Sequence, residues 1–450
     1  MFTRLQLKNF KSWEGLGPIQ LTPITVFFGS NSSGKTSVLQ SILLLKQTAE
    51  SSDRLRVLHP GDRSSLVDLG TVHDIIFGRG EQPRDVEILL GWRLPETITI
   101  PQSAPPGEVQ FILQVGTSED GEPYVRSVRY QMEHAHAAMV RREDSAGYDL
   151  STVPTLARRP GRPAVVPRPI RFYGFPEEVI RQYQNADWLV DLAFALEKQL
   201  ARVHYVGPLR EYPQRSYLWA GERPEDVGTR GDGAIPAILA ARAARKEIPR
   251  GEGTGRRYEA FETVVAHWLK RMGLIHSFQV HRIAKNRKEY EVRVRRTAES
   301  TEVLITDVGF GVSQVLPVLV QAYYAGENST VIFEQPEIHL HPRVQADLAD
   351  VLIDAAKRCH VQFIVESHSE HFLRRLQRRV AEYGMSEEGI SHDQVALYVC
   401  ELDEGRSRIS ELKVDEYGNI TNWPRDFFGD EIGDLAAMTE AATRRQGGRG

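Results

Sequence analysis

Cysteine is nearly absent from this sequence, in which only Cys359 and Cys400 occur among 450 residues. Two cysteines cannot form a disulfide framework or a cysteine-rich zinc cluster, and their scarcity favours a reducing compartment. Long hydrophobic runs are also missing, because segments such as 41–45 and 315–320 are far too short to span a bilayer. We therefore expect a cytoplasmic protein with no membrane partner.

The sequence also lacks a large excess of positive or negative residues, since the formal net charge is −4. This balance excludes a generally basic surface that coats DNA, but it leaves room for a local basic stripe. The N-terminus alternates apolar and polar residues as a strand does, and it lacks the basic segment and apolar core of a signal peptide. Because 450 residues are many for one core, we expect two or three domains or one domain with large insertions.

The sequence does contain a phosphate-binding loop. Residues 29–36 match the G-x-x-x-x-G-K-S/T pattern, with a buried-strand pattern before them and a helical pattern after them. In such a loop the backbone N–H groups face phosphates, the lysine reaches the β- and γ-phosphates, and the hydroxyl residue ligates Mg²⁺. We therefore expect ATP and Mg²⁺ as ligands, with Thr36 as a metal ligand. The predicted nucleotide-binding residues of the loop are Gly29, Ser30, Asn31, Ser32, Ser33, Gly34, Lys35, Thr36 and Ser37.

A second group of candidate site residues lies in the last third of the chain. The apolar segment 329–333 ends in Glu334, and an acid there needs a cation because an unpaired buried carboxylate is costly. A further apolar segment, 361–365, leads into the sequence Glu-Ser-His-Ser. His368 in that sequence is a candidate γ-phosphate sensor, because open α/β sheets place ligands at the carboxyl ends of their strands. The alternatives are an acidic turn and a structural histidine.

The order of patterns predicts an α/β ATPase that a large insertion divides. Short alternating runs from about 85 to 131 are typical of antiparallel hairpins, whereas 143–170 are rich in Pro, Arg and Gly and read as an irregular surface excursion. Helical patterns cover 176–203 and 258–272, a basic strand pair covers 282–296, and strands and helices alternate from 301 onwards. The predicted parts are an N-terminal ATPase segment at 1–90, a β-rich and irregular insertion at 91–200, a helical arm with basic strands at 201–300, a C-terminal ATPase segment at 301–400 and a C-terminal extension at 401–450.

Together these segments resemble the ABC-type AAA ATPases of the SMC, RecF and OLD-like group. There the P-loop follows an Asn-Phe-Lys segment, 9–11 here, and a long insertion, a signature segment, an acidic strand and a switch histidine come later. Residues 308–314, Val-Gly-Phe-Gly-Val-Ser-Gln, stand in the place of the signature. The resemblance implies a P-loop ATPase head with a mixed sheet, an antiparallel β subdomain and a large helical and β insertion.

Within that group the chain is most similar to a bacterial subfamily with a short C-terminal domain of unknown function. Its marks are Tyr-Val-Gly-Pro-Leu-Arg-Glu-Tyr-Pro at 205–213, Phe-Glu-Gln-Pro-Glu-Ile-His-Leu-His-Pro at 333–342, Glu-Ser-His-Ser-Glu-His at 366–371, and the segment 414–424 with Phe427 and Phe428. The resemblance covers 1–90 and 200–435 and says little about 91–199.

The resemblance also implies a homodimer or higher homo-oligomer. Each ATP would lie between the P-loop of one subunit and the signature segment of the other, here Gly309, Gly311 and Ser313. ATP would then hold the subunits together, and hydrolysis would release them.

Two positions depart from the group's pattern. Gly309 stands where the signature usually has a serine, so that contact is either missing or supplied by Ser313. Gln335 stands where a catalytic glutamate usually follows the metal-binding acid, and an amide cannot accept a proton as a carboxylate does. Either Glu337 substitutes as the base, or the protein hydrolyses ATP slowly and holds a long-lived ATP state. The predicted catalytic residues are Glu334, Gln335, Glu337 and His368, with Glu334 also as a metal ligand.

Several further residues have both a functional and a structural interpretation. Segment 68–74 could position Mg²⁺ or form a capped turn, and Arg210 could contact nucleotide or, as we favour, anchor the insertion. Basic residues at 282–296 and a second cluster could follow nucleic-acid phosphates, although charge runs are usually solvated surface. The second cluster comprises Arg374, Arg375, Arg378 and Arg379. We expect Trp423, Phe427 and Phe428 to pack as a C-terminal latch.

The sequence-based hypothesis is a dimerising ABC-type ATPase with slow turnover that acts as sensor or regulator of a separate effector. Bacterial anti-phage defence or another DNA-linked process is the expected setting, by family analogy. The alternatives are a nucleotide-gated scaffold with negligible hydrolysis and a RecF-like DNA-repair clamp. No nuclease is expected, because too few residues follow His368 for the acidic metal domain of the OLD relatives.

Overall fold

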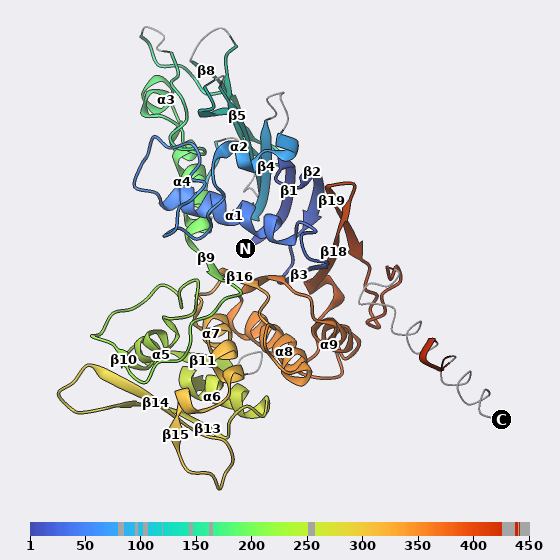
Figure 1. Ribbon diagram of the computed structural model, residues 1–450. Helices are drawn as coiled ribbons and strands as arrows, with labels where there is room; N and C mark the ends of the chain where they lie inside the picture. Colours follow the sequence, from blue (N-terminus) through green and yellow to red (C-terminus); the bar gives the residue numbers. More distant parts are fainter. Residues whose placement is uncertain are drawn as a thin grey trace.

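The computed structural model has a central sheet with further layers of structure on both sides (Figure 1). It describes residues 1–79, 85–94, 98–101, 107–118, 120–143, 147–161, 165–250, 257–424, 437–439 and 441. The α/β class with a mixed sheet and an antiparallel β subdomain, expected from the sequence, is confirmed.

The central sheet has six strands. In spatial order they are β19 (Arg406–Leu412), β18 (Val395–Asp403), β3 (Ile24–Gly29), β17 (Gln362–Glu366), β16 (Thr330–Glu334) and β9 (Val203–Val206). All neighbours are parallel except β19, which is antiparallel to β18. Strands β3, β16 and β17 are buried almost throughout, which explains their continuous apolar sequences. Their carboxyl ends meet at one edge of the sheet.

The antiparallel subdomain is a seven-stranded sheet. Its order is β2 (Trp13–Gln20), β1 (Phe2–Phe10), β4 (Val86–Arg93), β5 (Glu108–Thr117), β6 (Pro123–Gln131), β7 (His136–Arg141) and β8 (Tyr148–Val153). The hairpins predicted between about 85 and 131 are confirmed, and they continue the sheet that β1 and β2 begin. The prediction of irregular structure at 143–170 is wrong for β8, an edge strand that pairs with β7. Only Tyr148 of that strand is buried, so its sequence has little alternation to reveal it.

Helices lie on both sides of the central sheet. The α-helices are α1 (Lys35–Glu50), α2 (Val72–Ile75), α3 (Glu177–Gln182), α4 (Asp187–Ala201), α5 (Ala234–Ala243), α6 (Phe261–Arg271), α7 (Phe310–Tyr324), α8 (Pro342–Cys359) and α9 (Glu370–Ala381). Short 3₁₀ turns are η1 (Phe77–Arg79), η2 (Ile305–Asp307) and η3 (His392–Gln394). The remaining strands are β10 (Tyr217–Leu218), β11 (Glu247–Arg250), β12 (Arg257–Ala260), β13 (Ser277–Arg282), β14 (Glu289–Arg295) and β15 (Val303–Leu304).

Two apolar cores cover the opposite faces of the central sheet. Phe27 points to the core shared with α1, α4 and the antiparallel sheet, while Val26 and Phe28 point to the core shared with helices α5 to α9. This alternation is the period-two geometry of a strand. In Figure 1 the antiparallel sheet with α1 and α4 lies on one side, and α5 to α9 lie on the other. The loop after β3 is therefore anchored by a strand that is buried on both faces.

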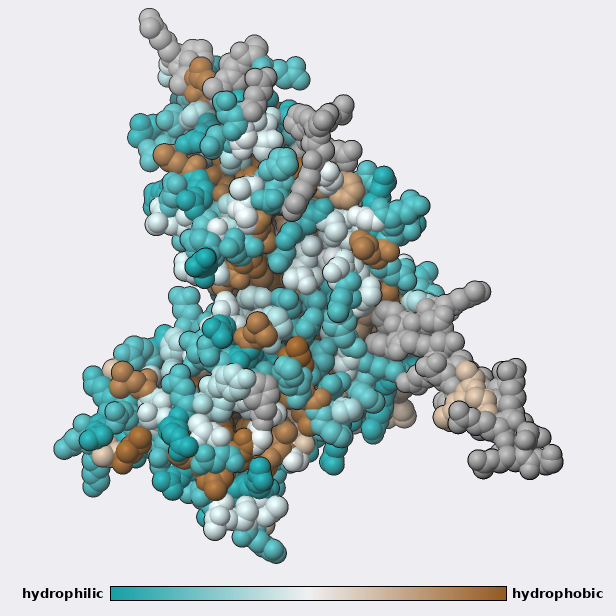
Figure 2. Space-filling view, in the orientation of Figure 1, coloured by the Kyte–Doolittle hydropathy of each residue, from teal (hydrophilic) through white to brown (hydrophobic). Residues whose placement is uncertain are grey.

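The surface of the described residues is largely hydrophilic. On the face shown in Figure 2, apolar residues form separate small patches among polar ones. Among the described residues, no helix combines the length and hydropathy that a membrane crossing requires.

Candidate functional site

The P-loop joins β3 to α1 and depends on two glycines. Gly29 has φ 140° and Gly34 has φ 96°, which are left-handed values that favour glycine. A Cβ at Gly29 would lie 2.1 Å from the carbonyl oxygen of Cys400, and one at Gly34 would lie 2.4 Å from the Ser407 hydroxyl. The neighbouring strands β18 and β19 thus lie directly against the loop and fix its path. A side chain at Gly29 or Gly34 would prevent this close contact.

Lys35 holds the curled loop from inside. Its Nζ donates to the carbonyl oxygens of Gly29 at 3.1 Å and Ser30 at 2.7 Å, and it lies 3.8 Å from Glu366 Oε1. Burial lowers the pKa of Lys35, and the Glu366 carboxylate acts in the opposite direction. The ammonium group therefore lies where the loop's N–H groups and the N-terminus of α1 converge, as phosphate binding requires.

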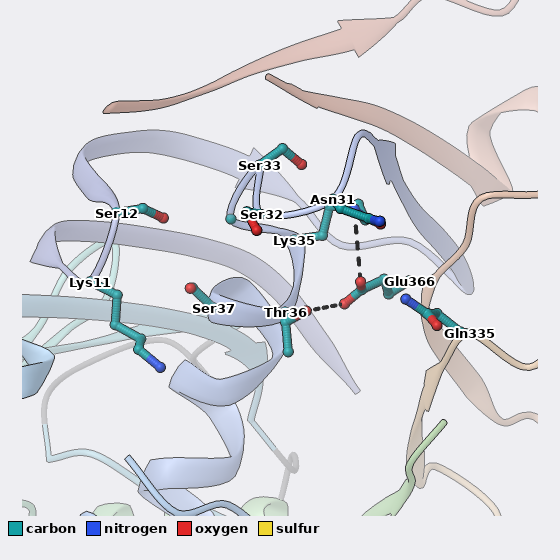
Figure 3. Close-up of a pocket in the computed structure, with 11 residues that line it drawn as sticks. Lys11, Ser12, Asn31, Ser32, Ser33, Lys35, Thr36, Ser37, Gln335 and Glu366 are labelled. Atoms are coloured by element: carbon teal, nitrogen blue, oxygen red, sulfur yellow. Dashed lines mark hydrogen bonds and ion pairs between the residues drawn. The ribbon is translucent and has the colours of Figure 1, made fainter. Parts of the chain in front are cut away.

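A cavity of about 350 Å³ opens in front of the loop. Figure 3 shows its lining side chains, with Thr36 and Glu366 facing each other and Gln335 beside Glu366. The described residues that line it are Lys11, Ser12, Asn31, Ser32, Ser33, Gly34, Lys35, Thr36, Ser37, Gln335 and Glu366. Most of the predicted loop residues therefore converge on one cavity of a size typical for small ligands. Gly29 and Ser30 are not among these lining residues, and their carbonyl oxygens accept hydrogen bonds from Lys35 Nζ.

Two carboxylates end adjacent strands beside this cavity. Glu334 ends β16 and accepts a hydrogen bond from the Tyr205 hydroxyl at 2.7 Å. Glu366 ends β17 and accepts one from the Thr36 hydroxyl at 2.8 Å. Burial raises the pKa of Glu334 and raises the pKa of Glu366 to about 7, with the Glu334 charge adding to the shift of Glu366. The acid in contact with Thr36 is thus Glu366, which the sequence-based reasoning did not select.

The sequence does contain a pattern that indicates Glu366 as a site residue. It ends an apolar strand segment as Glu334 does, and the same argument about an unpaired buried acid applies to both. The sequence does not reveal that Glu366 contacts Thr36, because this contact depends on strand order. Strand β17 lies between β3 and β16, and this order follows from long-range pairing.

Gln335, Glu337 and His368 surround the ends of β16 and β17. Gln335 has φ 45°, and its N–H donates to the Glu366 carbonyl oxygen at 2.9 Å. Glu337 Oε1 accepts from the Ser367 hydroxyl at 2.9 Å and from the His368 N–H at 2.6 Å. Glu337 is buried, which raises its pKa, and it is not among the described residues that line the cavity. Its carboxylate is thus engaged with the turn that carries His368.

His368 lies behind the loop. Burial lowers its pKa, and the Lys35 charge acts in the same direction, whereas a hydrogen bond to the Gly29 backbone acts in the opposite direction. Its Nε2 is buried and makes no hydrogen bond to any of the described residues. A buried ring nitrogen without a partner is a costly feature, and it leaves this atom available to a ligand.

The signature segment begins helix α7. Gly309 is the N-cap residue and is exposed, whereas Ser313 is buried in the first turns of the helix. Gly311 approaches Leu274, since a Cβ there would lie 3.5 Å from the Leu274 side chain. None of these three residues is among the described residues that line the P-loop cavity. Within one chain the predicted signature residues therefore do not line the cavity of the P-loop.

Arg210 links the loop after β9 to helix α7 and to the segment after β16. Its guanidinium donates to the carbonyl oxygens of Gln314 at 3.3 Å, Gln335 at 3.2 Å and Pro336 at 3.3 Å. The group is buried, which lowers its pKa to about 10. The structural interpretation of Arg210 is confirmed, and the carbonyls that it joins belong to α7 and to the segment after β16.

Three further candidate segments make structural contacts where the structure describes them. Thr71 and Asp74 form a capping box at α2, so segment 68–74 is the capped turn. The Arg374 guanidinium lies 4.6 Å from the Trp423 ring centroid, while Phe427 and Phe428 lie outside the described residues. The α9 arginines pair with acids, which favours a structural role, and the hypothesis that they follow nucleic-acid phosphates stays a prediction. The pairs are Arg374 with Glu370, Arg375 and Arg379 with Asp350, and Arg378 with Glu382.

Family models match three segments of the chain. Residues 4–88 match an AAA domain, residues 258–373 match an AAA ATPase domain, and residues 390–438 match a protein of unknown function, DUF3696. The first segment contains the P-loop, and the second contains the signature segment, Glu334 and His368.

Similarity to individual proteins is partial. The DNA replication and repair protein RecF of Rhodococcus erythropolis (strain PR4 / NBRC 100887) is 36% identical over 112 residues, which are 25% of this chain and 27% of that protein. The chain thus spans about a quarter of that relative's length.

Two solved SMC heads match over most of their length. The match to an SMC head bound to the C-winged helix domain of ScpA covers 92% of this chain and 98% of that structure's chain, with TM-score 0.46 and 11% identity. The match to the SMC head domain from Thermotoga maritima covers 92% of this chain and 99% of that structure's chain, with TM-score 0.40 and 12% identity. Two segments of the chain thus match AAA-type ATPase models and a third matches DUF3696, and the resemblance of the chain to the SMC, RecF and OLD-like ATPases is confirmed.

Proposed function

We propose that the chain binds ATP with Mg²⁺ at the P-loop cavity and hydrolyses it slowly between two subunits. The observation that supports this most is the convergence of Lys35, Thr36 and the N-terminus of α1 on one cavity. The triphosphate would accept hydrogen bonds from the loop N–H groups, and Lys35 would exchange its carbonyl partners for phosphate oxygens.

The residues around Thr36 suit a magnesium ion. The Thr36 hydroxyl and the carboxylate oxygens at the ends of β16 and β17 are hard oxygen ligands, which Mg²⁺ prefers. Glu334 would hold the cation or its water, and the cation would neutralise charge on the phosphates.

Slow hydrolysis follows from the residues near the attacking water. Gln335 lines the cavity, and its amide can orient a water molecule but cannot take its proton. Glu337 is bound to Ser367 and His368. We therefore assign Glu337 the role of positioning His368, in place of the role of base that the sequence suggested. His368 would contact the γ-phosphate through its unpartnered Nε2.

Dimerisation would complete the site. The N-terminus of α7 bears partial positive charge and exposes Gly309. Since Gly309, Gly311 and Ser313 are not among the described residues that line the cavity of their own chain, the nucleotide that they contact would be the one bound to a second copy. Gly309, Gly311 and Ser313 are the residues that we expect at this contact.

The binding site is tested by the change Lys35→Ala. Wild-type protein should bind a fluorescent ATP analogue in the presence of Mg²⁺, and Lys35→Ala should lose this binding. The control is Lys8→Ala, because Lys8 pairs with Glu87 on the antiparallel sheet. ATP binding that survives Lys35→Ala contradicts the assignment of the site.

The role in the cell rests on the resemblance. A sensor or regulator of a separate effector, in anti-phage defence or another DNA-linked process, is what we propose by family analogy. Cells that carry the Lys35→Ala variant should then lose the protective or regulatory effect of the wild-type protein. An unchanged effect in those cells contradicts this role.

A second candidate function is DNA binding by the β13–β14 hairpin. Figure 1 shows this hairpin projecting from the helical side of the molecule. Segment 282–296 carries seven basic residues, Arg282, Lys285, Arg287, Lys288, Arg293, Arg295 and Arg296, against Glu289 and Glu291. Its basic side chains are exposed, although Arg287 pairs with Glu289 and Arg293 with Glu291, and such a surface suits a phosphate backbone.

This candidate is tested by the salt dependence of duplex DNA binding. Glutamine at Lys285, Lys288, Arg295 and Arg296 should weaken binding and flatten its salt dependence, since about 0.9 counterions are released per phosphate contact. The control replaces Arg374 and Arg378, which are paired with acids on α9. Binding that depends on neither salt nor the hairpin charges contradicts the candidate.

A further inference from the structure

The register of the central sheet places two acids side by side. Glu334 and Glu366 are direct partners in the parallel ladder of β16 and β17. Strand β17 also pairs with β3, where Glu366 is opposite Phe27, two residues before the P-loop begins. Of the two acids, Glu366 is therefore the one on the strand that adjoins the P-loop strand.

The two acids are engaged differently. Glu334 directs Oε2 to the Tyr205 hydroxyl, 2.7 Å away, and it is not among the described residues that line the cavity. Glu366 lines the cavity and accepts from the Thr36 hydroxyl at 2.8 Å. Because Thr36 donates its proton to Glu366, the hydroxyl lone pairs remain free for a cation.

A bound triphosphate would change the charges around Glu366. Lys35 Nζ lies 3.8 Å from its Oε1, and it would move towards the phosphates once ATP is present. The carboxylate is buried, so it would then face phosphate charge of its own sign, with Glu334 as its ladder partner and Thr36 and Gln335 beside it. A buried carboxylate in that position is costly unless a cation lies between the like charges.

We propose that Glu366 is a magnesium-site carboxylate, which holds the cation of Mg·ATP together with Thr36, directly or through a bound water. This proposal rests on the proposed function, because the nucleotide must supply the remaining ligands. Mg²⁺ is usually held by one or two carboxylates together with substrate phosphates and water. The cation site of this chain thus comprises Thr36 with acids from two strands, Glu366 as well as Glu334.

The test is the Mg²⁺ dependence of ATP binding in the variant Glu366→Gln. A fluorescent ATP analogue is titrated at rising Mg²⁺ concentrations and, separately, in EDTA. The Mg²⁺ concentration for half-maximal binding should rise about 10- to 100-fold, the usual loss when a metal site loses a supporting group. In EDTA the variant should bind ATP as well as or better than wild type, because a negative charge near the phosphates is gone.

A second readout reports the cation itself. Mn²⁺ bound in the wild-type ATP complex should give an electron paramagnetic resonance signal of immobilised metal, and Glu366→Gln should reduce that signal at equal Mn²⁺ concentration. The matched control is Glu87→Gln, a carboxylate that pairs with Lys8 in the antiparallel sheet. This control should leave both readouts unchanged.

The outcomes separate the two proposals. If wild-type protein binds no ATP at any Mg²⁺ concentration, the proposed function fails. If wild-type protein binds Mg·ATP and Glu366→Gln keeps the same Mg²⁺ midpoint, only the role of Glu366 is contradicted. Weaker ATP binding by the variant in EDTA, with an unchanged Mg²⁺ midpoint, would show that Glu366 supports the fold of the loop and holds no cation.

Discussion

At the scale of single residues, the site depends on a few polar groups that are buried and close together. Lys35, Glu366 and Thr36 form one contact network, and Gln335 joins it through the Glu366 carbonyl. Such a network is strongly electrostatic because little water screens it. The chemistry of the site is therefore set by which of these groups carries charge.

The Gln335 amide gives a prediction about turnover. If the protein hydrolyses ATP slowly with a water that Gln335 orients, Gln335→Ala should lower the rate of phosphate release about tenfold or more, while ATP binding stays unchanged. A coupled phosphate-release assay measures the rate. No detectable release by wild-type protein would instead favour the nucleotide-gated scaffold.

The raised pKa of Glu366 gives a prediction about stability. Its pKa is about 7 in the folded, nucleotide-free protein because of burial, against 4.5 for an ordinary glutamate. Between these two pH values the folded state binds the proton more strongly than the unfolded state, so this group's contribution to stability falls as pH rises. Glu366→Gln removes that contribution.

The measurement is thermal unfolding of both proteins in EDTA from pH 5 to pH 8. The Tm of Glu366→Gln, relative to wild type, should increase as pH rises through about 7, where the wild-type carboxylate ionises. A Tm difference that is constant over this range contradicts a raised pKa of Glu366.

At the scale of elements, the path of the P-loop is fixed by its close contacts with strands β18 and β19. The loop could be predicted from the sequence because its motif is local: strand, glycine turn and helix are contiguous. The partner of Thr36 could not, because β17 is placed next to β3 by pairing between residues far apart in the chain. The edge strand β8 was missed because only Tyr148 in it is buried.

The glycines of this element give a prediction about stability and binding. Gly29→Ala should destabilise the fold by about 1–3 kcal/mol, because its φ of 140° is strained for alanine and its Cβ would meet the Cys400 carbonyl. It should also weaken ATP binding. The control is Gly15→Ala in β2, where a Cβ meets nothing within 4 Å. Equal Tm values for the two variants would contradict the account of the loop.

At the scale of the whole molecule, further layers of structure cover both faces of the six-stranded sheet. The proposed ATP site lies at the edge where its parallel strands end. The sequence predicted an ATPase head, but the sheet formed by β4 to β8 is continuous with β1 and β2. Long-range pairing of this kind leaves no local signal. Arg210 connects α7 to the segment after β16, so the helix that begins with the predicted signature residues and the segment that carries Gln335 are held by the same buried group.

The central claim is that ATP binds at a site shared between two copies of this chain. The most direct measurement is the mass in solution, by light scattering or mass photometry, with Mg²⁺ and a non-hydrolysable ATP analogue. The account predicts that wild-type protein shifts from monomer to dimer when the analogue is added and that Lys35→Ala stays monomeric. Saturating nucleotide that binds without any change in mass would contradict the account.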